Sequence, residues 1–389
     1  MFPKLYSKYS ISFSGPKNKI GVLKDAITCE VTEERNGAYE LKLIYPLSGI
    51  HADKIEIGTF IEAKANDFSE HLQLFRVYAI DKDLGDKFTV SAEHISYMLN
   101  GFIVKNGNHT GTPGMIFNAI NSSWITIANA SLVSHDYSFS FETDFETSGT
   151  ITVDQPSSIR AILGGSEGSL LDHWHGEYEF DNFNIKFLKN RGKDRGVIVS
   201  YGKNLTDLSL DNNDNSCYSH VFPYAAVQEE GSENMTIVYA KNGWTENTGS
   251  FTPQILPLFS DPSDGDCIIT RVKILDTTSM FSDSEALNPQ TVYNKASSYV
   301  SNRRTEIGKY TESLDVVYQP FGGGYGVPDM VFVDSVSLCD TMTVVYPRLN
   351  IRKSLKVNKT VYNVILEQYK SVSIGTPKSS FASTIKNEV

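Results

Sequence analysis

The chain has 389 residues, of which 40% are hydrophobic, 11% aromatic and 21% charged, so it can bury enough apolar surface to fold into several domains. Its 35 lysines and arginines and 46 aspartates and glutamates give a formal net charge of −11, which disfavours general binding to nucleic-acid backbones and anionic lipids. It has neither an apolar leader nor a run of about 18 apolar residues, and we expect no membrane-spanning segment.

The first region, from residue 20 to 97, alternates apolar and polar residues at a period of two, which is typical of β-strands joined by short turns. Its clearest strand covers residues 39–45. This strand follows Asn36-Gly37, a dipeptide that readily forms a tight hairpin turn, and it should therefore pair with residues 28–32. Further strands are predicted at residues 60–65, 72–80 and 88–92. Together they predict a small barrel or sandwich of about 100 residues.

Helix and hairpin signals follow this region. Thr112-Pro113 is typical of a helix start, because threonine can cap the first turn and proline is tolerated there. Farther along, apolar residues alternate on both sides of residues 181–182 and predict a β-hairpin with a two-residue loop. In that hairpin Glu177 would lie opposite Lys186.

The second half of the chain is rich in turn residues from about residue 202 and ends in another β region. Asn288-Pro289 precedes apolar residues at helical spacing and predicts one amphipathic helix. The strands of the final β region are predicted at residues 341–346, 354–357 and 361–369.

One short motif has the spacing of a serine hydrolase. Residues 164–168 read Gly-Gly-Ser-Glu-Gly, with Ser166 in the nucleophile position and Asp172 and His173 downstream. Such a serine must lie between a buried strand and a helix, whereas residues 158–163 are predicted to form a short helix that ends in the glycines. We therefore favour a helix C-cap, with a hydrolase as the alternative.

A second motif has the residue types of a metal site. His173, His175, Glu177 and Glu179 occupy alternate positions, so on a strand they would share one face, and zinc or iron accepts such ligands. Because Glu177 would already face Lys186 across the hairpin, we favour a solvated or subunit-facing strand surface. A metal held by His173 and His175 is kept as the alternative, and no cofactor is expected.

Basic residues gather near the end of this acidic chain. They are Arg348, Arg352, Lys353, Lys356 and Lys359. Such a run usually covers a solvated strand face, but it can also dock an acidic neighbour, and Arg348, Arg352, Lys353 and Lys356 are therefore our candidate interface residues. Since no nucleotide-binding motif and no further catalytic motif occur, the residues favour a structural protein whose surface is used for association.

Several segments together resemble those of a known family. They are residues 43–52 (LIYPLSGIHA), 92–97 (AEHISY), 151–168 (ITVDQPSSIRAILGGSEG), 176–182 (GEYEFDN), 201–205 (YGKNL), 336–341 (VSLCDT) and 359–364 (KTVYNV). On these segments the chain resembles, from about residue 20 to 385, the N-terminal hub region of siphophage tail-tip proteins. This family is known as the prophage endopeptidase tail or tail-associated lysin family.

The resemblance implies a mainly β, multidomain fold with a few helices, similar to the central hub of contractile-phage baseplates. Each subunit of such a hub carries two tail-tube-like β-barrels and two peripheral α+β domains. By analogy, the parts of this chain are a first barrel at residues 1–100, a peripheral α+β domain at 101–205, a second, discontinuous barrel at 206–240 and 334–375, a peripheral helix-containing domain at 241–333, and a C-terminal extension at 376–389.

The function implied by the resemblance is structural. Three subunits would form a homotrimeric ring that joins the distal tail protein ring to the tip and leaves a channel for DNA in transit. The C-terminus of the tape-measure protein and a separate lysin or receptor-binding protein are further expected partners. Such a hub belongs to the tail tip of the virion and is assembled in the cytoplasm of the bacterial host.

Longer family members carry a peptidoglycan-cleaving domain after this region, where this chain stops at Val389, so we do not expect an enzyme. Two alternatives stay open. One is a tail-associated cell-wall hydrolase that uses Ser166 or a metal. The other is a receptor- or glycan-binding module that uses exposed aromatic side chains such as Trp244.

Overall fold

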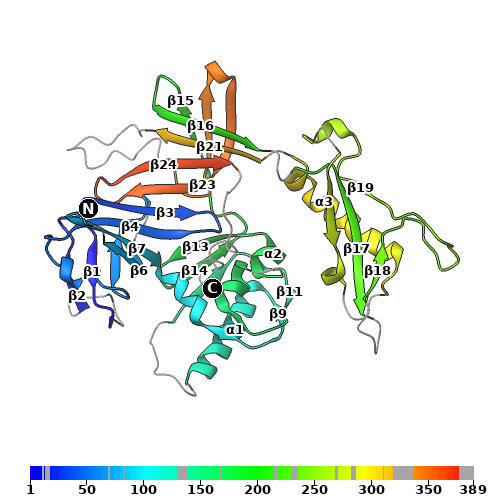
Figure 1. Ribbon diagram of the computed structural model, residues 1–389, viewed down its shortest axis with the longest axis horizontal. Helices are drawn as coiled ribbons and strands as arrows, with labels where there is room; N and C mark the ends of the chain where they lie inside the picture. Colours follow the sequence, from blue (N-terminus) through cyan, green and yellow to red (C-terminus); the bar gives the residue numbers. More distant parts are fainter. Residues whose placement is uncertain are drawn as a thin grey trace. The chain divides into compact units, whose positions relative to one another are not determined.

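The chain folds into two compact units. Unit 1 comprises Met1–Ser209 and Ser313–Val389, and unit 2 comprises Leu210–Glu312 (Figure 1). The computed structural model describes residues 1–10, 13, 18–68, 71–82, 84–129, 138–165, 168–213, 217–228, 235–267, 270–281, 286–309, 311–318 and 336–375. The fold is mainly β with a few helices, as the sequence predicts. Within the described ranges, no helix is long and apolar enough to cross a membrane.

One large sheet forms the framework of unit 1. Its strands follow the order β16-β21-β24-β23-β3-β4-β7-β6-β5-β1-β2, and β22 pairs with both β23 and β15. The late strands β23 and β24 lie beside the early strands β3 and β4 (Figure 1). The strands are β1 (Lys4–Tyr6), β2 (Lys19–Val22), β3 (Thr28–Glu34), β4 (Tyr39–Pro46), β5 (Phe60–Ala63), β6 (Gln73–Lys82), β7 (Lys87–His94), β15 (Asp194–Ser200), β16 (Leu205–Asn213), β21 (Thr311–Tyr318), β22 (Thr341–Tyr346), β23 (Ile351–Asn363) and β24 (Gln368–Gly375).

The first strands form as the sequence predicts. β3 and β4 make an antiparallel hairpin, and Asn36 in its turn has a φ of 51°, the left-handed conformation that this turn requires. Alternate residues of these strands, among them Val31, Leu41 and Leu43, are buried in the largest hydrophobic cluster. The large sheet runs from β2 at one end to β16 at the other. Its closure into two barrels stays a prediction.

Smaller sheets and helices complete unit 1. α1 (Pro113–Asn129) begins at the predicted proline and buries Phe117 and Ile120. The other elements are η2 (Ala52–Lys54), η3 (Ile95–Gly101), β8 (Ile103–Val104), β9 (Gly107–Gly111), β10 (Ser140–Thr143), β11 (Gly149–Val153), β12 (Ser157–Ser158), the π-helical turn η4 (Ala161–Gly165), α2 (Leu170–Trp174), β13 (Glu177–Asp181), β14 (Asn184–Leu188) and η7 (Pro347–Leu349).

β13 and β14 form the predicted hairpin, but the predicted register was wrong by two residues. Lys186 pairs with Glu179 instead of Glu177, so the loop is Asn182-Phe183, one residue later than predicted. Asn182 takes the left-handed φ of 51°, and its side-chain oxygen accepts a hydrogen bond from the Leu74 amide of β6. Because the shift is by an even number of residues, the apolar face of the hairpin is unchanged.

The last strands differ from the prediction. The predicted strand at residues 341–346 is β22, but β23 unites residues that we placed in two separate strands. A register shift between Val357 and Lys359 marks a bulge, which keeps the chain extended across the gap that we left between residues 357 and 361. The prediction of one strand at residues 361–369 was wrong, because β23 ends at Asn363 and β24 begins at Gln368. The turn between them follows Asn363, whose side-chain oxygen accepts hydrogen bonds from the Ile365 and Leu366 amides.

Unit 2 combines a small sheet with one long helix. β17 (His220–Gln228) pairs antiparallel with β18 (Met235–Tyr239) and β19 (Leu256–Pro257), and parallel with β20 (Val272–Asp276). α3 (Pro289–Ile307) begins where the sequence predicts, because the Asn288 side chain caps it by accepting a hydrogen bond from the Thr291 amide. Two short 3-10 turns, η5 (Pro262–Asp264) and η6 (Thr278–Met280), complete the unit.

The span 206–240, which the resemblance assigns to a barrel together with residues 334–375, divides between the two units. β16 pairs in the large sheet and crosses from unit 1 into unit 2 after Ser209, whereas β17 and β18 belong to the sheet of unit 2.

Candidate functional site

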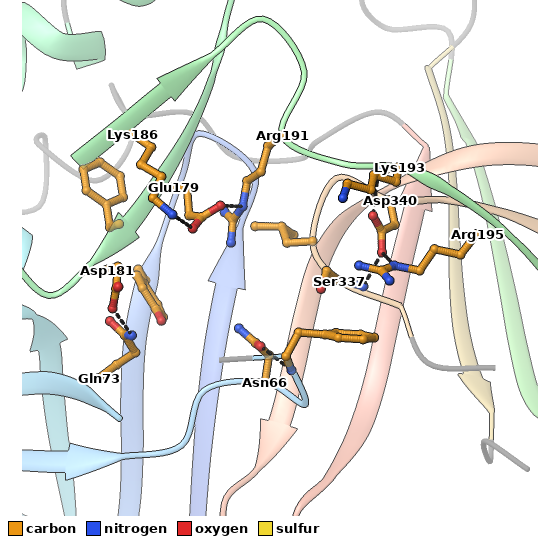
Figure 2. Close-up of a pocket in the computed structure, with 14 residues that line it drawn as sticks. Asn66, Gln73, Glu179, Asp181, Lys186, Arg191, Lys193, Arg195, Ser337 and Asp340 are labelled. Carbon is orange, nitrogen blue, oxygen red and sulfur yellow. Dashed lines mark hydrogen bonds and ion pairs between the residues drawn. The ribbon is translucent and has the colours of Figure 1, made fainter. Parts of the chain in front are cut away.

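A polar cleft of about 280 Å³ lies in unit 1. It is bordered by β13, by the extended segment 191–195, by the start of β6 and by the turn at residues 337–340 (Figure 2). The residues that line it are Tyr39, Asn66, Phe68, Gln73, Glu179, Phe180, Asp181, Lys186, Arg191, Lys193, Arg195, Ser337, Leu338 and Asp340. Charged side chains from segments far apart in the sequence therefore meet in one place.

Arg191 is the most buried cation of the cleft. One of its terminal nitrogens lies 2.8 Å from a Glu33 carboxylate oxygen, and its Nε lies 3.6 Å from Glu179. Burial is the largest single influence and by itself would lower the pKa of Arg191, but the neighbouring Glu33, Cys339 and Glu179 together outweigh burial and raise the pKa above its usual value. Glu179 also accepts a hydrogen bond from Lys186 at 2.9 Å. The ion pairs thus join β13 and β14 to β3 of the large sheet.

Asp340 organises the opposite wall of the cleft (Figure 2). Its carboxylate, only 2% exposed, accepts hydrogen bonds from the backbone amides of Lys193 at 2.7 Å and Ser337 at 2.8 Å. It also accepts one from Arg195 Nε at 2.6 Å, and the Arg195 guanidinium lies 4.3 Å from the centre of the Phe68 ring. One carboxylate therefore holds segment 191–195 against the turn that precedes β22.

Gln73 connects the cleft to the core. Its side-chain nitrogen donates to Asp181 at 2.8 Å, and its side-chain oxygen accepts from the Asn182 amide at 3.0 Å and from His94 Nε2 at 3.1 Å. His94 Nδ1 in turn accepts a hydrogen bond from the Ser96 amide at 3.3 Å. This pattern assigns the neutral tautomer with the proton on Nε2. Burial, aided by the charge of Arg160, lowers the pKa of His94 well below its usual value.

The buried His94 makes the stability of unit 1 sensitive to acid. In the unfolded chain the His94 side chain takes up a proton near pH 6.5, whereas in the folded chain it stays neutral. Its contribution to the free energy of unfolding is therefore complete above this pH and is lost as the pH falls. We expect a loss of about 2 kcal/mol from this group between pH 7 and pH 5. Urea titrations of the wild type and of His94→Gln at both pH values measure it. An equal loss in both proteins would contradict this prediction.

The polar groups of the cleft are engaged with one another. Glu179, Asp181 and Asp340 each accept hydrogen bonds from donors on another segment of the chain. In the part of the chain that the structure describes, no group of three or more histidine, cysteine, aspartate or glutamate side chains could hold a metal ion. The arrangement is therefore that of a junction which fixes segments relative to one another within unit 1.

The two candidate metal ligands do not lie on a strand, and that prediction was wrong. His173 lies in the last turn of α2, and His175 caps the helix with a left-handed φ of 55°. Only Glu177 and Glu179 lie on β13. The common strand face that the metal alternative needed is absent, because Ser169 caps a new helix by accepting a hydrogen bond from the Asp172 amide.

The position of Asp172, the expected catalytic acid, argues against the hydrolase alternative. Ser166 lies outside the described residues. Asp172, the expected acid, accepts a hydrogen bond from the Gly168 amide at 3.1 Å at the start of α2. A carboxylate at a helix N-terminus is favourable for the helix itself, and this position accounts for Asp172 without a catalytic role.

The basic run divides into two parts. Lys356 forms an ion pair with Glu177 and a hydrogen bond to Asn190, and Lys359 pairs with Glu34 at 2.8 Å. Lys353 is partly buried on β23. Arg348 and Arg352, by contrast, lie near the turn between β22 and β23, and both are exposed. Two of the four candidate interface residues therefore stay available at the surface.

Reasoning from the sequence missed the cleft. Arg191, Lys193 and Arg195 stand at alternate positions, a pattern that could have indicated one charged face of an extended segment. No comparable signal marks Asp340, because its three donors come from residues 3, 145 and 147 positions away.

No family model and no curated protein matches this chain. Three solved structures are similar to it over nearly their whole length. They are the prophage tail protein gp18 from Listeria monocytogenes (12% identity, TM-score 0.55, 99% of this chain and 98% of that one), the 43 kDa tail protein of prophage MuSo2 from Shewanella oneidensis (10%, 0.58, 96% and 98%) and a tail protein from Neisseria meningitidis (9%, 0.54, 98% and 98%). At these identities the likeness concerns the fold, and the chain has the fold of prophage tail proteins.

Proposed function

We propose that this chain is a structural hub protein of a bacteriophage or prophage tail. The observation that carries the proposal is the fold shared with three tail proteins over 96–99% of this chain. The cleft supports it, because its charged side chains hold segments of the chain together and are not arranged around a reacting group. The role of the protein is then association, and it is not an enzyme.

The finer assignment is a homotrimeric ring at the tail tip that joins the distal tail protein ring to the tip and contacts the C-terminus of the tape-measure protein. In this assignment residues 1–100 supply one barrel of each subunit, and β16 of the span 206–240 contributes to the other barrel together with residues 334–375. The net charge of −11 supports a conduit for DNA, because a negative wall repels the phosphate backbone.

Purified tail particles test the location. Mass spectrometry of particles from the source bacterium is expected to detect this chain, and a gold-labelled antibody against it is expected to mark the tip in electron micrographs. An antibody against the major tail-tube protein, which should mark the whole shaft, is the matched control. Particles that lack the chain, or label spread along the shaft, would contradict the proposed location.

Light scattering during size-exclusion chromatography tests the ring. The expected mass is that of three subunits of 43.3 kDa each, for the purified chain alone or together with the distal ring protein. Release of soluble fragments from purified cell walls by the chain alone would argue for the hydrolase instead.

A further inference from the structure

The sheet of unit 2 has one face covered by a helix and one open face. α3 runs along β17 and β18 (Figure 1), and Val221, Ala225 and Leu275 on that side of the sheet are buried in the clusters that α3 completes. Since side chains alternate along a strand, the neighbouring residues point to the other side. These residues form what we call the open face: Phe222, Tyr224, Ile237, Tyr239, Val272 and Ile274.

The open face is largely apolar and continuous across three strands, and it ends at Asp276, which pairs with Tyr224 and accepts a hydrogen bond from the Tyr224 hydroxyl. Phe222 pairs with Ile274 of β20, and Tyr224 pairs with Tyr239 of β18, so their side chains are neighbours. The Phe222 and Tyr239 rings lie 5.6 Å apart. Ile274 is 71% exposed and Ile237 48%. Exposed patches of this kind in soluble proteins mark surfaces that another molecule covers.

The charge of unit 2 indicates which kind of surface would bind to the open face. Residues 210–312 contain 14 aspartates and glutamates and 7 lysines and arginines, so this unit carries −7 of the total net charge of −11. One of these carboxylates, Asp276, lies on the open face beside Tyr224. The surface that covers this face should therefore combine apolar side chains with positive charge, because complementary charge favours the encounter and suppresses other partners.

Unit 1 presents a surface of this description at the turn between β22 and β23. We call it the basic tip and define it as Tyr201, Arg348, Leu349 and Arg352. Leu349 is 57% exposed, and the Arg348 guanidinium lies 4.9 Å from the centre of the Tyr201 ring. Among the described residues, no carboxylate lies within ion-pair distance of Arg348 or Arg352. Arginines of this kind also stack well on aromatic rings such as Phe222 and Tyr239.

We propose that the open face of one copy of this chain binds the basic tip of a second copy. Two different surfaces meet in this contact, so it is a head-to-tail contact that can repeat around an axis and close into a ring. The inference rests on the proposed hub function, and it adds to it the two surfaces through which the copies associate.

Complementary variants of the full chain test the pairing. The face variant carries Ile237→Asp and Ile274→Asp, and the tip variant carries Arg348→Glu and Arg352→Glu. Ile57→Asp, at an isoleucine of unit 1 that is 59% exposed, is the matched control. A milder face variant, Ile237→Thr with Ile274→Thr, keeps strand-forming residues in case the aspartates impair folding. Circular dichroism verifies that each variant is folded.

Light scattering gives the readout at subunit concentrations on the order of 10 μM, where a specific contact of ordinary affinity is populated. We expect the wild type and Ile57→Asp to self-associate. The association constant of the face variant and that of the tip variant should each be at least 100-fold lower than that of the wild type. In a mixture of the two variants, the intact basic tip of the face variant can bind the intact open face of the tip variant. Because only this one contact is possible, the mixture should form a complex of two chains and no closed ring.

Three results would overturn the inference: a wild type that stays monomeric, a face variant with the wild-type mass, or a mixture in which both variants remain monomeric. If the face variant keeps the wild-type mass while tail particles contain the chain, only the surfaces are assigned wrongly. If the particles lack the chain, the proposed function itself fails.

Discussion

Replacing Gly192 by alanine is expected to destabilise unit 1 by about 3 kcal/mol or more, because the new methyl group has no space. A Cβ atom at this position would lie 1.9 Å from the backbone oxygen of Cys339 and 2.5 Å from the backbone nitrogen of Asp340. The obstacle is backbone, so relief requires moving segment 191–195 away from the turn. That movement breaks the hydrogen bonds from Lys193 and Arg195 to Asp340.

The parallel pairing of β15 with β22 depends on the same close approach. The Thr341 amide donates to the Lys193 carbonyl at 3.0 Å, where the two strands begin to run side by side. A shift of segment 191–195 therefore also loosens this edge of the large sheet. We expect Gly192→Ala to lower the urea concentration at the midpoint of unfolding, followed by circular dichroism.

Gly101 provides the matched control for Gly192. It lies in the same unit, and a Cβ atom there would have no neighbour within 4 Å. Gly101→Ala is expected to change the free energy of unfolding by less than about 0.5 kcal/mol. Equal effects of the two substitutions would show that the close approach to Cys339 does not matter for stability.

The sequence predicted local structure well where one residue pattern decides it. Asn36-Gly37 and Asn288-Pro289 mark a turn and a helix start through their own backbone preferences, and both are found where expected. The residue pattern was insufficient where two local structures were both compatible with it and a tertiary contact decided between them. The hairpin register of β13 and β14 is set in part by Asn182, which docks on Leu74 of a strand more than 100 residues earlier.

The candidate site was harder to predict than the fold. His173 and Glu177 are spaced as a strand would require, but the cap at Ser169 starts a helix that includes His173, and this short signal outweighed the periodicity. The charged residues of the cleft come from three separate segments. A sequence shows that Arg191 and Glu33 are charged, but only the fold shows that they are 2.8 Å apart.

Among the described residues, Arg160 is the largest side chain that is fully buried, and its replacement should have the second large effect. Its guanidinium lies 3.9 Å from the centre of the Tyr97 ring and 5.5 Å from that of Phe180, and it donates a hydrogen bond to Ser96 Oγ at 3.2 Å. A desolvated cation held over aromatic rings is worth about 2 kcal/mol or more. Its aliphatic stem also fills volume in the core, so charge and packing both contribute.

Two substitutions separate charge from volume at this position. Arg160→Ala leaves a cavity among large side chains and is expected to cost about 3–5 kcal/mol in the free energy of unfolding. Arg160→Met keeps most of the volume and removes a charge whose burial is itself unfavourable, so it should cost only about 1 kcal/mol. Similar losses for both would mean that the charge, and not the packing, stabilises this core.

The methionine variant also changes the response to acid, because Arg160 is one of the two causes that lower the pKa of His94. Without this charge His94 takes up a proton at a higher pH in the folded state, so less stability is lost between pH 7 and pH 5 than in the wild type. Urea titrations of Arg160→Met at both pH values measure the difference. An unchanged loss would mean that burial alone keeps His94 neutral.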